Sequence, residues 1–273
     1  MGTSQSSTGP GAGVSLVPPW ADESLAPSGA EGQSQDGSGL DDQQPMPTVE
    51  QSDLAPPRRF MSARRHLGQF AKTGDKQSLK AGVGHYISSG YGGSKTFSRR
   101  MAGTANTAWS LGRVLDPSES GTSFDRTLLS SSSANQIMDA VVEAVRSHDG
   151  TQDAESGREA VREALTELLT RFPDADLLDL TDAQREFVLE KFVVNDVFNR
   201  FQLDVGKHLL EKAPTPAIAA KRMQEVKDYM AEVIAESFRN LAEKGAELTS
   251  GSIVPTVNDA LVESCRVFEE YTE

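Results

Sequence analysis

The sequence predicts an all-α protein, a helical bundle or an orthogonal helical array preceded by a disordered N-terminal tail. Three observations support this prediction. From residue 133 onward, apolar residues recur at helical spacing behind capping residues, and no strand-like alternation competes with that pattern. Residues 1–57 hold too few large apolar residues to offset the entropy of folding.

Charge divides the chain into three segments. Residues 1–57 hold eight acids and no Lys or Arg, residues 58–113 hold eleven bases and one acid, and residues 114–273 hold the remaining 31 acids and 16 bases. We therefore expect an acidic tail rich in Gly, Ser and Pro, a basic helical segment interrupted by glycine, and an acidic helical domain. The net charge of −13 argues against general nucleic-acid binding by the whole chain.

Capping signals place the helices of the acidic domain. Ser133, Ser156 and Thr181 are each followed three residues later by Gln or Glu, which is the pattern of a capping box. Thr215 precedes a proline at the first helical position, and we expect Thr256 to cap the last helix. The helix that begins at Thr181 carries the longest apolar stripe, so we expect it to lie centrally.

Glycine divides the basic segment. We expect a short helix over 62–72 and a later helix capped by Ser94. Between them, we expect five glycines to break regular structure: Gly82, Gly84, Gly90, Gly92 and Gly93.

The bases of this segment could form a contact surface. Its candidate residues are Arg64, Arg65, Lys95, Arg99 and Arg100. The acidic part of the same chain, an acidic partner protein and nucleic acid are all electrostatically suited to it, and we favour the protein contacts over nucleic acid.

The sequence offers no catalytic motif, so we expect no enzyme activity, no cofactor and no metal. The glycine-rich stretch 89–96 lacks the glycines of a P-loop and a strand before it. The four histidines lack zinc-site spacing, and the acids of 174–182 lack the glycine and distal Glu of an EF-hand. The single cysteine, Cys265, is expected to pack as a small apolar residue.

The sequence lacks the signals that would direct it to a membrane or to secretion. No apolar run approaches the roughly 18 to 20 residues of a membrane-spanning helix. The N-terminus lacks both the basic region and the apolar region of a secretory signal. We therefore expect a cytoplasmic protein with no membrane association.

Two short motifs stand out in the tail. The opening Met1-Gly2-Thr3-Ser4 favours removal of Met1, which leaves Gly2 with an open α-amine that can act as a nucleophile. Gly2 and Ser6 together also fit the N-myristoylation pattern Met-Gly-x-x-x-Ser, and Gly2 could simply reflect cloning or composition. Further on, residues 14–20 read VSLVPPW, which is either chance composition or a proline-stiffened motif that docks in a groove.

The motifs together resemble the QatB family, a component of bacterial Qat anti-phage defence systems. The resemblance rests on Gly2-Thr3-Ser4 with Gly9-Pro10, on Leu16-Val17-Pro18-Pro19-Trp20, on the basic region from Arg64-Arg65 to Arg100, and on Val197-Phe198-Asn199-Arg200-Phe201-Gln202-Leu203-Asp204-Val205-Gly206. It runs over most of the chain in order, and residues 25–55 have no counterpart in it.

The resemblance implies a set of partners: an ATPase (QatA), a QueC-like enzyme (QatC) and a TatD-like nuclease (QatD). It implies that the QueC-like enzyme conjugates a 7-deazaguanine-type base to an N-terminal glycine. On this sequence Gly2 is the acceptor, and Thr3 and Ser4 are its recognition context. We add the inference that Pro18, Pro19 and Trp20 form a second docking site for that enzyme, while the helical domain docks other components.

Overall fold

The structure is a computed structural model that describes residues 58–119, 124–146, 152–246, 248–249 and 251–272. Every regular element in these ranges is helical, which confirms the all-α prediction. The predicted tail, residues 1–57, lies outside the described residues. In chain order the helices are α2 (Met61–Thr73), α3 (Lys76–Tyr91), α4 (Ser94–Arg100), α5 (Ala102–Leu115), α6 (Arg126–Leu129), α7 (Ala134–Val145), α8 (Gln152–Arg171), α9 (Asp182–Phe201), the π-helix η2 (Gln202–Gly206), α10 (Lys207–Lys212), α11 (Pro216–Glu243) and α12 (Ile253–Glu269).

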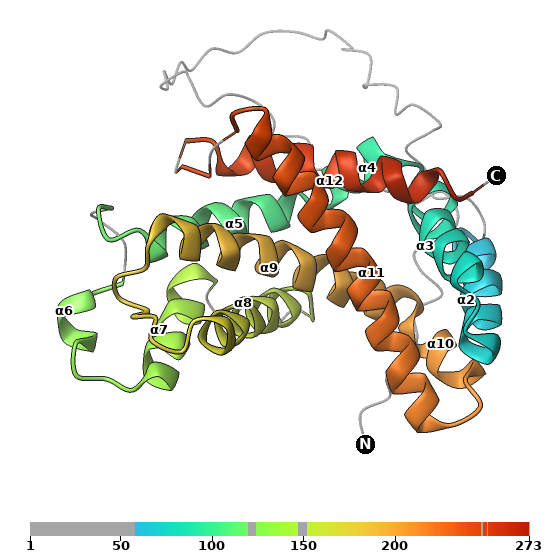
Figure 1. The fold of residues 1–273 in the computed structure, drawn as a ribbon, viewed down its shortest axis with the longest axis horizontal. Helices are drawn as coiled ribbons and strands as arrows, with labels where there is room; N and C mark the ends of the chain where they lie inside the picture. Colours follow the sequence, from blue (N-terminus) through green and yellow to red (C-terminus); the bar gives the residue numbers. More distant parts are fainter. Residues whose placement is uncertain (1–57, 120–123, 147–151, 247, 250, 273) are drawn as a thin grey trace, which may run out of the picture.

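One hydrophobic cluster joins the basic and acidic segments. It begins at Phe60 and extends to Phe268, with buried residues from both segments between them. Helix α9 packs against α5, α8 and α11, and α12 packs against α3, α4, α5 and α11 (Figure 1). The basic segment is therefore part of the same core as the acidic helices.

The long apolar stripe after Thr181 forms a continuous helical stretch with one irregular turn. Helix α9 passes into the π-helix η2 at Gln202, and α10 follows directly at Lys207. A π-turn inserts one extra residue into the helical ladder, and such turns are frequent at functional sites. Here it shifts the register of the helix at Asp204, whose carboxylate accepts a hydrogen bond from the buried Tyr86 hydroxyl.

Three of the five expected glycine breaks were wrong. Gly82, Gly84 and Gly90 lie inside α3, and each faces a neighbouring element closely. A Cβ at these positions would lie 2.8 Å from Leu67 Cδ2, 2.5 Å from the Phe268 carbonyl oxygen and 2.6 Å from Phe60 Cε1, respectively. These glycines are packing residues, because they let other parts of the chain approach the α3 backbone.

The other two glycines do end the helix. Gly92 is the C-cap of α3 with a left-handed φ of 76°, and Gly93 follows with a φ of 101°. Gly93, and not Ser94 as expected, is the N-cap of the next helix. Helix α4 is short, because it ends at Arg100 and a new helix, α5, begins after Met101.

Two of the three predicted capping boxes are confirmed. Ser133 and Thr181 accept a hydrogen bond from the backbone N–H three residues on, and the Gln side chain there accepts one in return. Thr215 caps α11 as expected. The box at Ser156 was wrong because α8 already begins at Gln152. The expectation for Thr256 was also wrong, because α12 begins at Ile253.

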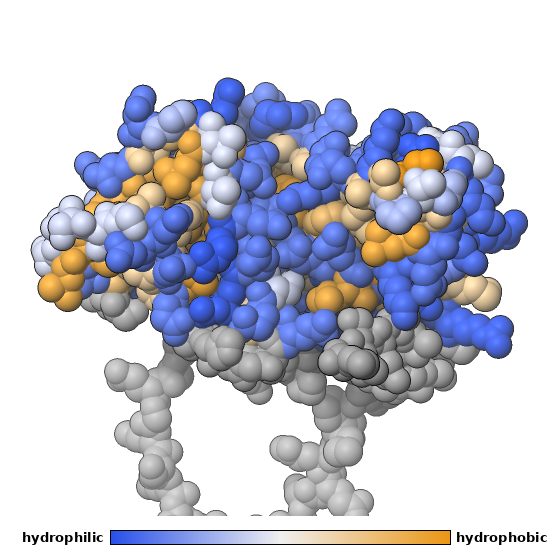
Figure 2. Space-filling model, turned by 90° about the horizontal axis from the view of Figure 1, so that it is seen from below, coloured by the Kyte–Doolittle hydropathy of each residue, from blue (hydrophilic) through white to orange (hydrophobic). Residues whose placement is uncertain are grey.

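The face that Figure 2 shows is mostly hydrophilic, with apolar residues exposed toward both ends of the molecule. Leu128, on the short helix α6, is 77% exposed. None of the helices in the described ranges combines the length and the apolar character that crossing a bilayer requires.

Candidate functional site

The predicted modification and docking residues cannot be placed in the fold. Gly2, Thr3, Ser4, Pro18, Pro19 and Trp20 all lie outside the described residues. Their proposed roles therefore remain predictions from the sequence.

The five predicted contact bases are distributed over two helices. Arg64 and Arg65 lie on α2, and the Arg64 guanidinium donates a hydrogen bond to the backbone carbonyl of Asp204 (3.2 Å). Lys95 and Arg99 line a hollow of 330 Å³ formed by α4, Ala102 and residues of α12. Arg100 lines a different pocket. The structure therefore does not bring the five bases together at one site.

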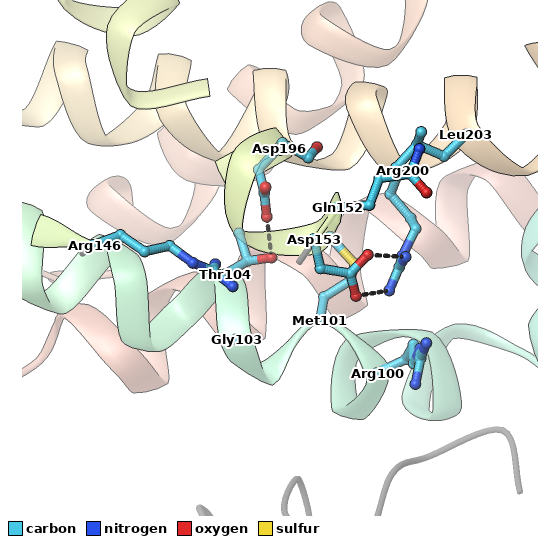
Figure 3. A pocket seen from close by; sticks show the side chains of 11 residues that line it. Arg100, Met101, Gly103, Thr104, Arg146, Gln152, Asp153, Asp196, Arg200 and Leu203 are labelled. Atoms are coloured by element: carbon cyan, nitrogen blue, oxygen red, sulfur yellow. Dashed lines mark hydrogen bonds and ion pairs between the residues drawn. The ribbon is translucent and has the colours of Figure 1, made fainter. Parts of the chain in front are cut away.

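That second pocket lies where five helices and the π-helix meet. Its volume is 360 Å³. We call it the arginine pocket and define it by six of its charged and polar residues: Arg100, Thr104, Arg146, Asp153, Asp196 and Arg200 (Figure 3). They come from the end of α4, from α5, from the C-cap of α7, from the first turn of α8 and from α9.

Arg200 is fixed in the wall of the pocket by a bidentate ion pair. Its Nη1 and Nη2 atoms lie 2.8 and 3.1 Å from the two carboxylate oxygens of Asp153. Burial lowers the pKa of Arg200, but the nearby Tyr91, Asp153 and Asp204 raise it by more, so the guanidinium is held in its charged form. The pair joins α9 to the start of α8, and bidentate pairs of this kind are among the stronger charged contacts.

Asp196 lies one turn before Arg200 on α9. Its Oδ2 atom accepts a hydrogen bond from the Thr104 hydroxyl at 2.5 Å. Burial raises the pKa of this carboxyl, and the hydrogen bond from Thr104 and the positive charges of Arg146 and Arg200 only partly offset that effect. A carboxylate held in this way in a polar cavity is a typical feature of a binding site.

Arg146 reaches the pocket from the opposite side to Arg100 (Figure 3). Its guanidinium donates a long hydrogen bond to the Thr107 hydroxyl (3.5 Å). It passes closely over Gly157 of α8, where an added Cβ would lie 2.9 Å from Nη1. The small residue at position 157 therefore lets Arg146 cross α8.

A buried tyrosine pair lies next to the pocket. The Tyr86 and Tyr91 hydroxyls both donate to Oδ2 of Asp204, at 3.0 and 2.5 Å. Burial, and then the charge of Asp204, raises the pKa of each tyrosine above its ordinary value. Both rings pack edge-on against Phe97, and Tyr86 also packs against Phe201. The aspartate thus ties the π-helix to α3.

Other candidate chemistry is limited in the described part of the chain. No group of three or more His, Cys, Asp or Glu residues there could hold a metal ion. Cys265 is buried in the core, and burial raises the pKa of its thiol well above the ordinary value. Its expected packing as a small apolar residue is confirmed.

Sequence reasoning missed the residues of α9 and η2 that face the pocket and the tyrosine pair. Asp196, Arg200 and Asp204 follow each other at intervals of four residues, within the helical stretch that carries the longest apolar stripe. Residues four apart share a helix face. Charged residues repeating on one side of an otherwise apolar helix were the signal that could have revealed them.

The fold and the pocket define an all-helical protein with an arginine-lined polar pocket where its helices meet. A family model described as Qat anti-phage system associated protein QatB matches residues 92–268, which is more than half of the chain. The chain therefore belongs to the QatB family and is an anti-phage defence protein whose partners are other components of the Qat system. No curated protein and no solved structure matches the chain.

Proposed function

We propose that the chain is a non-catalytic, cytoplasmic substrate and adaptor of the Qat system. In this proposal a QueC-like enzyme, QatC, conjugates a 7-deazaguanine-type base to the α-amine of Gly2 after removal of Met1. The helical domain docks other components, with the ATPase QatA and the TatD-like nuclease QatD as candidates. The observation that carries the proposal is the Met1-Gly2-Thr3-Ser4 opening on a chain of this family.

The position of Gly2 in the chain supports this role. Fifty-six residues separate Met1 from Arg58, the first described residue. A chain of that length could span at most roughly 190 to 200 Å when fully extended. The α-amine of Gly2 could therefore enter the active site of a partner enzyme while the helical domain is held elsewhere in a complex.

The test is the intact mass of the full chain, expressed alone and together with QatC. Expressed alone, the chain is expected to lose Met1 and carry no addition. Co-expression is expected to add the mass of the base, and fragmentation should place it on the N-terminal residue. An unchanged mass with QatC present would refute the modification.

Two variants sharpen the experiment. Gly2→Ala still allows removal of Met1 and leaves a free amine, so loss of modification in this variant would show that glycine itself is required. Gly9→Ala is the matched control, because it makes the same change in the same segment away from the amine, and it should remain fully modified. An added fatty acyl mass in place of the base would instead support the alternative function, a scaffold protein that is N-myristoylated at Gly2.

A further inference from the structure

Two arginines of the arginine pocket have no acidic partner among the residues that the structure describes. Within the described residues, the Arg100 side chain forms no hydrogen bond or ion pair, and the Arg146 side chain forms only the 3.5 Å hydrogen bond to Thr107. The two carboxylates of the pocket already have partners, because Asp153 pairs with Arg200 and Asp196 accepts from Thr104. The pocket therefore has a surplus of positive charge on its Arg100 and Arg146 sides.

This arrangement is suited to an oxyanion. Guanidinium groups bind phosphate and carboxylate through paired N–H donors, and such charged hydrogen bonds are stronger than neutral ones. Arg100 and Arg146 approach the pocket from opposite sides, with the Asp153–Arg200 pair drawn between them (Figure 3), so both side chains must turn inward to reach one anion. An anion with oxygens on several faces can then engage more of their donors than a planar carboxylate can. Phosphate has this shape.

The pocket also offers an acceptor beside the arginines. Asp196 uses Oδ2 for the Thr104 hydroxyl, while its other carboxylate oxygen has no hydrogen bond from a described residue. A bare anion would be repelled by this oxygen, whereas a ligand that places a hydroxyl or amino group there would donate to it. The 360 Å³ volume lies within the range of small-molecule sites.

We propose that the arginine pocket binds a small organic phosphate, with Arg100 and Arg146 holding the phosphate and Asp196 accepting a hydrogen bond from a hydroxyl or amino group of the ligand. Arg200, fixed by Asp153, and Thr104 hold the acceptor side of the pocket in place. This inference does not rest on the modification of Gly2, and the two are measured by different experiments.

The experiment is calorimetric titration of the full chain with three probes: inorganic phosphate, ribose 5-phosphate, and gluconate as a carboxylate with similar hydroxyls. Ribose 5-phosphate should bind most tightly, because it alone offers both phosphate and a hydroxyl donor. Absence of ribose 5-phosphate binding up to about 1 mM would refute the proposal. Tighter binding of gluconate would refute the phosphate preference and make the site a carboxylate site.

Arg100→Gln tests the anion side of the pocket. This arginine has no partner among the described residues, so its loss should leave the fold unchanged. It should weaken ribose 5-phosphate binding by about tenfold or more, since a hydrogen bond to a charged group is lost. Arg171→Gln is the matched control: it removes the same charge at the other end of α8, roughly 28 Å along the helix from Gln152, and should bind normally. Equal affinity of the two variants would overturn the assignment.

Asp196→Asn tests the acceptor side with opposite outcomes for two probes. Its side-chain oxygen can still accept from Thr104, while the amide turns the pocket-facing acceptor into a donor. Inorganic phosphate should bind more tightly because a negative charge is removed, and ribose 5-phosphate should bind more weakly because its hydroxyl loses an acceptor. A change in the same direction for both probes would exclude a direct contact between Asp196 and the ligand. Unfolding curves should show that this variant is folded.

Discussion

Replacement of Gly84 by Ala should destabilise the protein because α3 and α12 are in close contact at this position. The added Cβ would lie 2.5 Å from the backbone carbonyl oxygen of Phe268 and 2.9 Å from Cγ2 of Thr272. Phe268 lies in the last turn of α12, and its carbonyl accepts a 3.3 Å hydrogen bond from the N–H of Tyr271 that would break if the carbonyl turned away. Relief of the clash therefore requires α3 to move relative to α12.

Gly206 provides the matched control for the same substitution. It is also a buried helical glycine, but an added Cβ would lie 3.4 Å from Gln202 Cβ and 3.4 Å from Met223 Cε, at ordinary contact distance. Ala is favoured over Gly in a helix interior by about 1 kcal/mol. At Gly206 this gain should dominate, and the free energy of unfolding should rise by about 0.4 to 1 kcal/mol.

At Gly84 the overpacking should outweigh that gain. Forcing a methyl group into a well-packed contact costs typically about 1 to 3 kcal/mol, and a backbone neighbour places Gly84 at the upper end. We expect a net loss of about 1 to 2 kcal/mol in the free energy of unfolding, after subtracting the helix preference. For a domain of this size, each kcal/mol shifts Tm by about 2 to 4 °C.

Urea unfolding followed by circular dichroism measures both variants against the parent chain. The expected result is a lower midpoint for Gly84→Ala and an equal or higher one for Gly206→Ala. Destabilisation of similar size in both variants would refute the reasoning, because the loss of stability would then not come from the close contact between α3 and α12 at Gly84.

Further predictions concern the tyrosine pair, the helix caps and the basic segment. Tyr91→Phe removes a 2.5 Å hydrogen bond to a carboxylate and should lower the free energy of unfolding by about 1.5 to 3 kcal/mol, whereas Tyr271→Phe, at a partly exposed residue, should change it by less than about 0.5 kcal/mol. Because the pKa values of Tyr86 and Tyr91 are raised above 10.0 in the folded state, their contribution to stability should be constant below pH 10.0 and decrease as the pH rises further. In an absorbance titration these two tyrosines should ionise only as the protein unfolds. Thr181→Ala should cost about 1 kcal/mol in thermal unfolding, and Ser156→Ala, inside α8, should cost little; equal losses would contradict the assigned helix start. In filter-binding assays we expect no retention of nucleic acid even at low salt, and salt-dependent binding there would instead support the nucleic-acid alternative.

Sequence motifs predicted a helix start correctly where a nearby side chain accepts the hydrogen bonds of the first backbone N–H groups. The capping boxes at Ser133 and Thr181 and the Thr215-Pro216 start were correct because each cap bonds to N–H groups only a few residues away. The same pattern at Ser156 failed because α8 already begins at Gln152, with Ala154 and Gly157 buried. A capping motif does not mark the start of a helix where packing favours a start earlier in the chain.

The candidate pocket was much less predictable. The sequence drew attention to the basic segment and placed Arg100 on the contact surface. It could not show that Arg100 and Arg146 flank one cavity, because they lie on different helices and their approach depends on how α4, α7 and α8 pack. The aspartates and arginine of α9 and η2 were visible only as charges within an apolar stripe.

The sequence by itself determined the helical class, the segments of charge, the family resemblance and the helix starts at Ser133, Thr181 and Thr215, because these depend on composition, periodicity and contacts between near neighbours. The tertiary structure alone decided that the basic segment belongs to the core, that the glycines of α3 are packing residues, and that charges from several helices share one pocket. Each of these depends on the distance between groups far apart in the chain, and helix packing sets that distance.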